Sequence, residues 1–403
     1  MKENLLKSVV MVCIVAMLFG VAPSVYASNI DSKEIVEAQF NTNFPDVSFA
    51  DIYALATVEL NYNVVEKDNI KIDYNFIPLV TIDGKRYAFF IPLVKGKDLV
   101  GYMVMGAVDG NYLMLELSFS EPAFTNYIIG ESQKNTIIYK FPSWFIAKNG
   151  NEYSLISNNL EKHDISQNIS AFSTSVVDML VKSNEFNVQP TSSLYESVGL
   201  TNWQNFVPVY YGSTTYYGGW QDWLGPNYYN FVSQYWADRA CGPTAAANAA
   251  YHMSVYKSGM GNLYYMPSLT RYLFTYHMYG VYQYVTPTDV GILYIDEMAT
   301  KFKAYAASRG VNINGVFSGL PWNIVNVANY IKSGLSINSP VLLVTWNTAI
   351  SGLAWHWVTI TRYYRTDAGN RYITTSNRDC MKTYNLDVWV NEIGLYRGVI
   401  YFN

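Results

Sequence analysis

The first half of the chain changes from a helical to a strand-like pattern of apolar positions. Between Ser48 and Leu60, apolar residues recur three or four positions apart, which predicts a helix with one buried face. Short apolar runs follow, each closed by a turn that contains Asp, Gly or Asn. These runs predict strands at 77–82, 86–94, 99–107 and 112–119. Because short turns join consecutive runs, we expect an antiparallel meander with the helix on one face.

The second half of the chain is helical first and strand-like afterwards. Helical spacing and end signals predict helices at 243–257, 286–309 and 322–332. After Pro340 the apolar runs become β-branched and aromatic and have the length of strands. They lie at 341–346, 356–365, 372–376 and 398–402. We therefore predict an α+β fold in which a helical half meets an antiparallel sheet half, with a cleft between the two halves.

The same pattern predicts where the units of the chain begin and end. Residues 1–27 have a basic start, an apolar run too short to span a bilayer and a small-residue exit site. We expect them to be a signal peptide of a secreted protein, with no membrane span left after its removal. The stretch 151–200 is rich in Ser and Asn and predicts a linker. It separates a small α+β unit at 28–150 from a larger unit at 201–403.

Composition and charge narrow the class of protein. Half of the residues are hydrophobic and only 14% are charged, which excludes a disordered chain. The net charge of −4 offers no basic excess for nucleic acid. Residues 28–195 carry a net charge of −8 and residues 196–403 a net charge of +3, so the two units are expected to attract each other. With 4 His and 3 Cys, we expect no metal site, no disulfide scaffold and no cofactor.

One cysteine stands where irregular chain turns into a predicted helix, in the segment Cys241-Gly242-Pro243-Thr244. Proline suits the first turn of a helix, so Cys241 is expected at the helix N-terminus or just before it. Unpaired backbone N–H groups and the helix dipole favour a thiolate there, which predicts a lowered thiol pKa. A small buried cysteine at a helix start is the plain alternative.

His356 lies between two tryptophans at the start of a predicted apolar strand. It is the imidazole best placed to act on the thiol. A histidine beside a thiol takes its proton and later returns it to a leaving group. His252 lies on the same predicted helix as Cys241 but about three turns away, ~16 Å, which is too far to touch the thiol. His277 is expected to be structural and His163 to belong to the linker. For His356 the alternative is a core histidine bonded to backbone.

A third group is needed to orient the imidazole. Counting through a four-residue turn puts both Asn377 and Asp379 on the His356 side of the predicted hairpin. The alternation of side chains between the two faces of a strand admits both residues and does not choose between them. A one-residue bulge would place Arg378 and Cys380 there instead. Cys380 is also a possible disulfide partner of the helix-start cysteine, and that bond would silence the thiol.

In the order Cys, His, Asn, these segments resemble the papain-like cysteine peptidases, particularly the branch of the bacteriocin-leader peptidases. The resemblance covers roughly residues 205–403. The matching segments are Cys241-Gly242-Pro243-Thr244, Pro340-Val341-Leu342-Leu343, His356-Trp357-Val358-Thr359-Ile360 and Tyr372-Ile373-Thr374-Thr375-Ser376-Asn377. The resemblance implies Cys241 as the nucleophile that forms a thioester with a peptide or protein substrate, His356 as acid and base, and Asn377 as the orienting amide. In this family a glutamine six residues before the cysteine helps to bind the oxyanion; Tyr235 stands there, and Gln234 is the nearest glutamine.

The unit at 28–150 resembles the inhibitory pro-segments of secreted bacterial cysteine peptidases in its helix, its meander and its acidic charge. The resemblance implies a precursor whose pro-region is a partner of its own catalytic unit; an unrelated adhesion or folding module is the alternative. Two other functions stay open for the whole protein. One is a peptidoglycan-directed Cys/His amidase or endopeptidase, because the aromatic residues between Tyr210 and Trp236 suit stacking on glycan. The other is a catalytically inactive, aromatic-rich secreted binding module.

Overall fold

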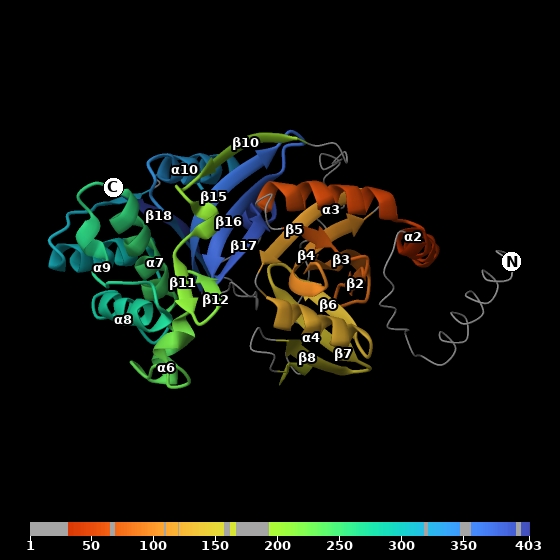
Figure 1. Ribbon diagram of the computed structural model, residues 1–403, viewed down its shortest axis with the longest axis horizontal. Coiled ribbons are helices and arrows are strands. Elements are labelled where there is room, and N and C mark those ends of the chain that lie inside the picture. The colour runs from red at the N-terminus through yellow and green to blue at the C-terminus, as the bar shows by residue number, and fades with distance from the viewer. Residues whose placement is uncertain are drawn as a thin grey trace, which may run out of the picture.

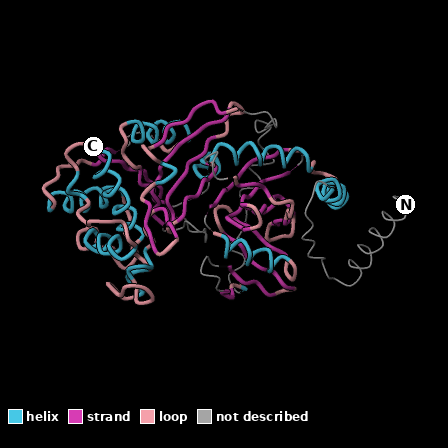
Figure 2. Tube along the Cα trace, viewed as in Figure 1, coloured by secondary structure: helices cyan, strands magenta, loops and turns pink. Residues whose placement is uncertain are grey.

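The computed structural model describes residues 31–64, 69–108, 110–119, 121–156, 162–166, 193–317, 321–346, 356–391 and 396–403. The predicted signal peptide and most of the predicted linker lie outside the described residues. The fold is mixed α+β, as predicted. Two lobes are visible, with strands running through both (Figure 1, Figure 2). We call residues 31–166 the N-terminal unit and residues 193–403 the C-terminal unit.

The elements of the N-terminal unit are α2 (Asp31–Asn43), α3 (Phe49–Asn63), β1 (Ile70–Ile72), β2 (Ile77–Val80), β3 (Arg86–Lys95), β4 (Asp98–Val108), β5 (Asn111–Phe119), α4 (Pro122–Ser132), β6 (Thr136–Lys140), β7 (Trp144–Asn149), β8 (Glu152–Ile156) and β9 (Lys162–Asp164). Those of the C-terminal unit are β10 (Leu194–Gly199), η3 (Trp203–Asn205), β11 (Pro208–Tyr211), β12 (Thr214–Tyr217), η4 (Gln221–Leu224), α6 (Gln234–Ala237), α7 (Cys241–Tyr256), η5 (Gly261–Leu263), α8 (Arg271–Tyr282), α9 (Ile295–Ser308), β13 (Gly315–Phe317), α10 (Ile324–Ser336), β14 (Val341–Trp346), β15 (His356–Thr366), β16 (Arg371–Asn377), β17 (Cys380–Asn385), α11 (Leu386–Asn391) and β18 (Tyr396–Phe402).

A single sheet passes through both units. Its strand order is β13-β18-β14-β15-β16-β17-β5-β4-β3-β2-β6-β7-β8-β9, with β1 on β3 and β10 on β15. The units join where β17 pairs antiparallel with β5, and this register sets Lys382 opposite Ser118 and Tyr384 opposite Glu116. Figure 1 shows these two strands side by side at the junction of the lobes. The predicted meander is therefore present, and its last strand continues into the sheet of the other unit.

The N-terminal part of the sheet is covered on both faces. Along β3, Phe89 packs in one core with Phe49 of α3, whereas its neighbour Phe90 packs in another with Phe124 of α4. Because side chains alternate between faces of a strand, burial on both faces requires apolar residues at successive positions. The predicted helix over 48–60 is α3, and Ser48 caps it by accepting a hydrogen bond from the backbone N–H of Asp51.

In the C-terminal unit, α7 is the buried helix that packs against the sheet. Its alanines from Ala245 to Ala250 are 2% exposed or less, and Thr359 of β15 donates to the carbonyl oxygen of Ala245 at 3.4 Å. Small side chains let a helix lie close to a neighbouring strand. This close packing sets the N-terminus of α7 beside the first residues of β15.

Three features of the structure differ from the sequence predictions. The helix predicted over 286–309 begins at Ile295, because Thr288 and Gly291 form a turn in which Gly291 has a φ of 87°. The helix α8 was not predicted, although Thr270 caps its start. The predicted linker also contains strands: β8 and β9 extend the N-terminal sheet, with His163 opposite Leu155, and β10 pairs with β15.

Candidate active site

Cys241 is the first residue of α7 and is 6% exposed. Ala240 precedes it as the capping residue and has no side-chain acceptor for the N–H groups of the first turn. The backbone N–H groups of Cys241 and Gly242 instead face the Cys241 thiol and act to lower its pKa. Gly242 keeps the turn close to the neighbouring chain, because a Cβ there would lie 2.9 Å from the side chain of Ile292. The thiol therefore lies at a tightly packed helix start, as the sequence predicted.

His356 begins β15 and Asn377 ends β16, which is the next strand of the sheet. The imidazole Nε2 of His356 lies 2.9 Å from Oδ1 of Asn377. An amide oxygen only accepts hydrogen bonds, so Nε2 carries the proton and Nδ1 is left as a proton acceptor. The structure thus brings His356 and Asn377 together in the arrangement that the sequence analysis favoured.

The strand register that brings these two residues together differs from the prediction twice. The turn between β15 and β16 is one residue shorter, because the N–H of Thr366 donates to the carbonyl oxygen of Asn370 at 3.0 Å. A bulge just after Ile360 shifts the register by one residue more. Each shift alone would reverse the parity of the faces, but together they restore it. Asn377 therefore stays on the His356 side of the hairpin.

One small cavity joins these groups. Its lining consists of Gly219, Trp220, Gln221, Cys241, Thr244, Ala245, Asn248, His356, Trp357, Ser376, Asn377 and Arg378. Its volume of about 10 Å³ is close to that needed for a single water molecule. A cavity of this size holds only a few atoms, and any larger group must lie outside it. No described residue of the N-terminal unit is part of this lining.

The two reactive groups are both electrically neutral in this environment. Burial raises the pKa of the Cys241 thiol, although hydrogen bonds from the backbone of Trp357 and Gly242 act in the opposite direction. Burial and the neighbouring Arg378 guanidinium lower the pKa of His356 to about 3. The predicted lowering of the thiol pKa at the helix start is therefore wrong in its net direction, because desolvation outweighs the backbone N–H groups. The resting pair is a thiol and an imidazole.

Asp379 lies on the turn between β16 and β17 with a φ of 61°, and it does not line the cavity. Its carboxylate accepts a hydrogen bond from the Cys380 thiol at 3.3 Å, and burial raises its pKa to about 7. The structure thus sets Asn377, and not Asp379, beside His356. No disulfide joins Cys241 and Cys380, so the bond considered from the sequence is not formed.

The glutamine of the cavity is not the one that the sequence singled out. Gln234, at the start of α6, donates to the Asp238 carboxylate at 2.8 Å and does not line the cavity. Tyr235 is 47% exposed. Gln221 of η4 lines the cavity with Cys241, and its Nε2 donates to the backbone carbonyl of Asp238 at 2.8 Å. An amide nitrogen carries two N–H groups, so one remains for a substrate oxygen.

Two glycines just before Gln221 explain how this residue comes to line the cavity, although it is distant in the sequence from Cys241. Gly218 has a φ of 101°, and a Cβ there would lie 2.1 Å from Oγ of Ser376. Gly219 donates its N–H to Oδ1 of Asn248 on α7 at 2.8 Å. The segment before Gln221 is therefore held against both α7 and β16. This Gly-Gly pair is the signal in the sequence that marks a close approach of backbone.

The remaining histidines of the C-terminal unit lie away from the cavity; His277 was expected to be structural and His252 to be too far from the thiol. His252 contacts Oδ1 of Asn338 at 3.2 Å, and burial lowers its pKa to about 4. His277 contacts the carbonyl oxygen of Ala247 at 3.3 Å, and burial lowers its pKa to about 3. Neither lines the cavity.

Comparison with known proteins adds no family to this description: no protein-family model and no curated protein matches the chain. Among the described residues, no group of three or more His, Cys, Asp or Glu side chains is placed to hold a metal ion. In the same part of the chain, no helix combines the length and the apolar character needed to cross a lipid bilayer.

Proposed function

We propose that this protein is a cysteine-type peptidase of papain-like architecture that hydrolyses peptide bonds through a thioester at Cys241. The observation that carries the proposal is the 2.9 Å contact between His356 Nε2 and Asn377 Oδ1, in a cavity that also contains the thiol at the start of α7. This contact leaves Nδ1 of His356 as the base. The helical part before the strands β14 to β18 supports the same architecture.

The residues of the cavity supply each step of acyl transfer. Nδ1 of His356 takes the proton of the Cys241 thiol as the sulfur attacks the carbonyl carbon. The backbone N–H of Cys241 and the amide N–H of Gln221 stabilise the oxyanion. The C–N bond then breaks as the imidazolium returns the proton to the departing amine, and a thioester remains. Water attacks the thioester with His356 as base, which releases the acid and restores the thiol.

We further propose that the substrate is a peptide or protein outside the cell, in keeping with the predicted signal peptide. The proposed chemistry uses only side chains and backbone groups of this chain, and it requires no cofactor. Whether the N-terminal unit is cut from a precursor stays a prediction from its resemblance to pro-segments.

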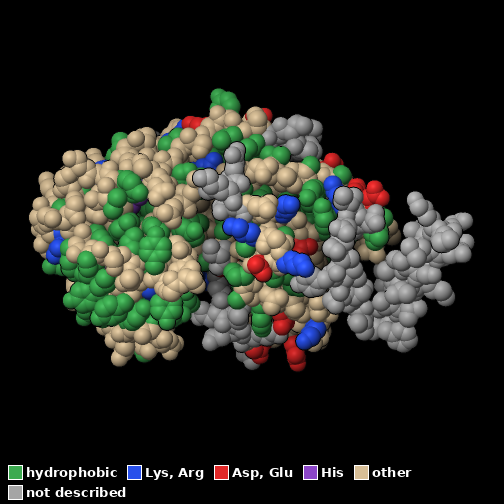
Figure 3. All heavy atoms as spheres, viewed as in Figure 1, with side chains coloured by type: hydrophobic (Ala, Val, Ile, Leu, Met, Phe, Trp, Pro, Cys, Tyr) green, Lys and Arg blue, Asp and Glu red, His purple; other side chains and the backbone are tan. Residues whose placement is uncertain are grey.

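A peptidoglycan-directed amidase or endopeptidase is the second candidate, and one surface feature favours it. Exposed tyrosines gather on the C-terminal unit, among them Tyr211, Tyr228 and Tyr272. Figure 3 shows broad green surface over this unit, whereas blue and red charged side chains gather over the N-terminal unit. Arg271 lies 3.6 Å from the ring centre of Tyr211 within this group. Rings of this kind stack on sugar faces as well as on peptide side chains.

Thiol labelling and substrate hydrolysis test the proposal together. Iodoacetamide should label Cys241, and the rate should increase with pH because burial raises the pKa of this thiol. Cys241→Ala should abolish both labelling and hydrolysis of a peptide mixture. Cys380→Ala is the matched control, because it removes the other buried cysteine of the C-terminal unit, and it should leave both intact.

The substrates in that experiment separate the candidate functions. Hydrolysis of peptidoglycan alone would favour the second candidate. No hydrolysis of either substrate, with Cys241 no more reactive than a model thiol, would contradict both enzymatic functions and favour an inactive binding module.

The two glutamines give a further prediction. Gln221→Ala should lower kcat by about 10²-fold with little change in KM, because one oxyanion donor is lost. Gln234→Ala should change kcat little, since its amide bonds the Asp238 carboxylate outside the cavity. Steady-state kinetics on one peptide substrate measures both variants. A larger effect of Gln234→Ala than of Gln221→Ala would contradict the assignment.

A further inference from the structure

The junction between the two units lies in the same sheet as the candidate active site. Tyr384 is on β17, two strands from His356, and β17 pairs with β5 of the N-terminal unit. Tyr384 is fully buried and stands opposite Glu116 in the register. The N-terminal unit thus supplies the next strand of the sheet that carries the orienting residue Asn377.

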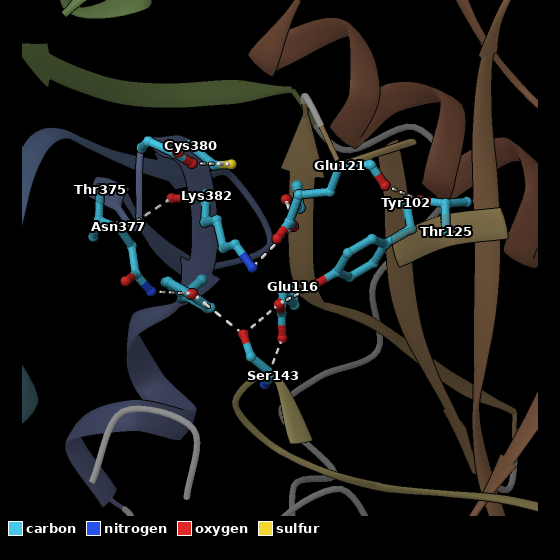
Figure 4. Close-up of polar contacts among 12 residues, drawn as sticks. Tyr102, Glu116, Glu121, Thr125, Ser143, Thr375, Asn377, Cys380 and Lys382 are labelled. Atoms are coloured by element: carbon cyan, nitrogen blue, oxygen red, sulfur yellow. Dashed lines mark hydrogen bonds and ion pairs between the residues drawn. The ribbon is translucent and has the colours of Figure 1, made fainter. Parts of the chain in front are cut away.

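A directed chain of hydrogen bonds crosses this junction (Figure 4). The Ser143 hydroxyl donates to Oε1 of Glu116 at 2.6 Å. Its proton is then used, so the 3.3 Å contact between Ser143 Oγ and the Tyr384 hydroxyl has Tyr384 as donor. The Tyr384 oxygen in turn accepts from Nδ2 of Asn377 at 3.1 Å. The chain therefore runs from the Asn377 amide through Tyr384 and Ser143 to a carboxylate.

Glu116 is the fixed end of this chain. It is 0% exposed and accepts four hydrogen bonds. Besides the Ser143 hydroxyl, the donors are the Tyr102 hydroxyl at 2.7 Å, the Tyr139 hydroxyl at 2.9 Å and the backbone N–H of Ser143 at 2.8 Å. Ser143 has a φ of 63°, a conformation that residues other than glycine rarely adopt. A carboxylate can only accept hydrogen bonds. Glu116 therefore determines which group is the donor and which the acceptor in every bond of the chain.

We propose that the N-terminal unit helps to complete the active site, in that Glu116 and Ser143 act through Tyr384 as positioning residues for Asn377. This inference rests on the proposed function, because in that function Asn377 orients His356. The chain holds Nδ2 of Asn377 toward Tyr384, so Oδ1 faces His356. That orientation fixes the proton on Nε2 of His356 and keeps Nδ1 free to accept the thiol proton.

The opposite amide orientation shows what the chain prevents. If the Asn377 amide turned over, its N–H groups would face Nε2 of His356, which would have to be an acceptor. The single proton of the neutral imidazole would then lie on Nδ1, and the base would be lost. The position of the N-terminal unit agrees with this role, because its strand β5 pairs with β17 and none of its described residues lines the cavity.

The tautomer of His356 gives a test that does not depend on catalysis. In the full chain labelled with ¹⁵N-histidine, His356 should be protonated at Nε2 in wild type, with its signals assigned by their loss in His356→Ala. Ser143→Ala and Tyr384→Phe should both convert it to a mixture of tautomers. Tyr305→Phe is the matched control, because it removes a buried hydroxyl that donates to the carbonyl oxygen of Leu263 at 2.7 Å, away from Asn377. Unchanged tautomers in both junction variants would overturn the proposal.

Kinetics on the same variants separates this proposal from the proposed function. Ser143→Ala and Tyr384→Phe should lower kcat by about 10-fold or more with KM nearly unchanged, which is typical of lost orienting partners. In an Asn377→Ala background, Tyr384→Phe should have no further effect on kcat, because it acts through Asn377. An inactive wild type with the expected tautomer change would contradict the peptidase alone. An active wild type with Tyr384→Phe equal to Tyr305→Phe would contradict the positioning role alone.

Discussion

His356→Ala is expected to lower kcat/KM for peptide hydrolysis by at least about 10³-fold, the scale on which loss of a catalytic histidine acts. The reason lies in the neutral resting pair. Burial raises the pKa of the Cys241 thiol, so the sulfur attacks only when a base takes its proton. Nδ1 of His356 is the base that the contact with Asn377 leaves available. Progress curves with one peptide substrate measure the loss.

Two neighbouring variants define how specific that loss is. Asn377→Ala should lower kcat by about 10- to 100-fold, because it removes the orienting partner but leaves the base. Asp379→Asn should have little effect, since Asp379 lies on the turn and bonds Cys380. If Asp379→Asn were the more severe change, the assignment of Asn377 as the orienting residue would be wrong.

His356 and Asn377 show how much of the candidate site could be predicted from the sequence. An apolar strand that begins with His356 and a proline-marked helix that begins near Cys241 are local patterns, and both were predicted to within two residues. Parity could not choose between Asn377 and Asp379, because both lie on the same face. The structure separates them because β16 ends at Asn377 and Asp379 lies on the following turn, while a shortened turn and a bulge shift the register by two residues in total. Neither irregularity has a clear signal in the residues of the hairpin.

Features that depend on long-range pairing were not predictable. Ser143 and Tyr384 are 241 positions apart, and no local pattern indicates that β17 would join β5. A sign was present in Glu116, which interrupts an apolar strand that the structure buries on both faces. Gln221 was missed because the family spacing directs attention to Gln234, whereas its actual place depends on the close approach of the preceding glycines.

One ion pair between an acidic and a basic side chain crosses the junction of the two units. Lys382→Met is expected to lower the free energy of unfolding by about 3–5 kcal/mol, because it leaves a buried carboxylate without its cation. Nζ of Lys382 lies 2.9 Å from Oε2 of Glu121 across the junction, and the side chains are 1% and 9% exposed. Burial acts to lower the pKa of Lys382, but Glu121 and other neighbouring groups together raise this pKa above its ordinary value. Urea denaturation measures the change.

A surface pair and a double variant show whether burial is the cause. Lys332 pairs with Glu196 at the same 2.9 Å, but these side chains are 27% and 30% exposed, so Lys332→Met should change stability by only about 0.2–1 kcal/mol. Lys382→Met combined with Glu121→Leu should recover most of the loss, because no unpaired charge remains buried. Equal losses for Lys382→Met and Lys332→Met would contradict this explanation. The double variant also shows whether the ion pair affects the active site. It removes the ion pair next to Tyr384 but leaves the hydrogen-bond chain to Asn377 in place, so the His356 tautomer should stay as in wild type.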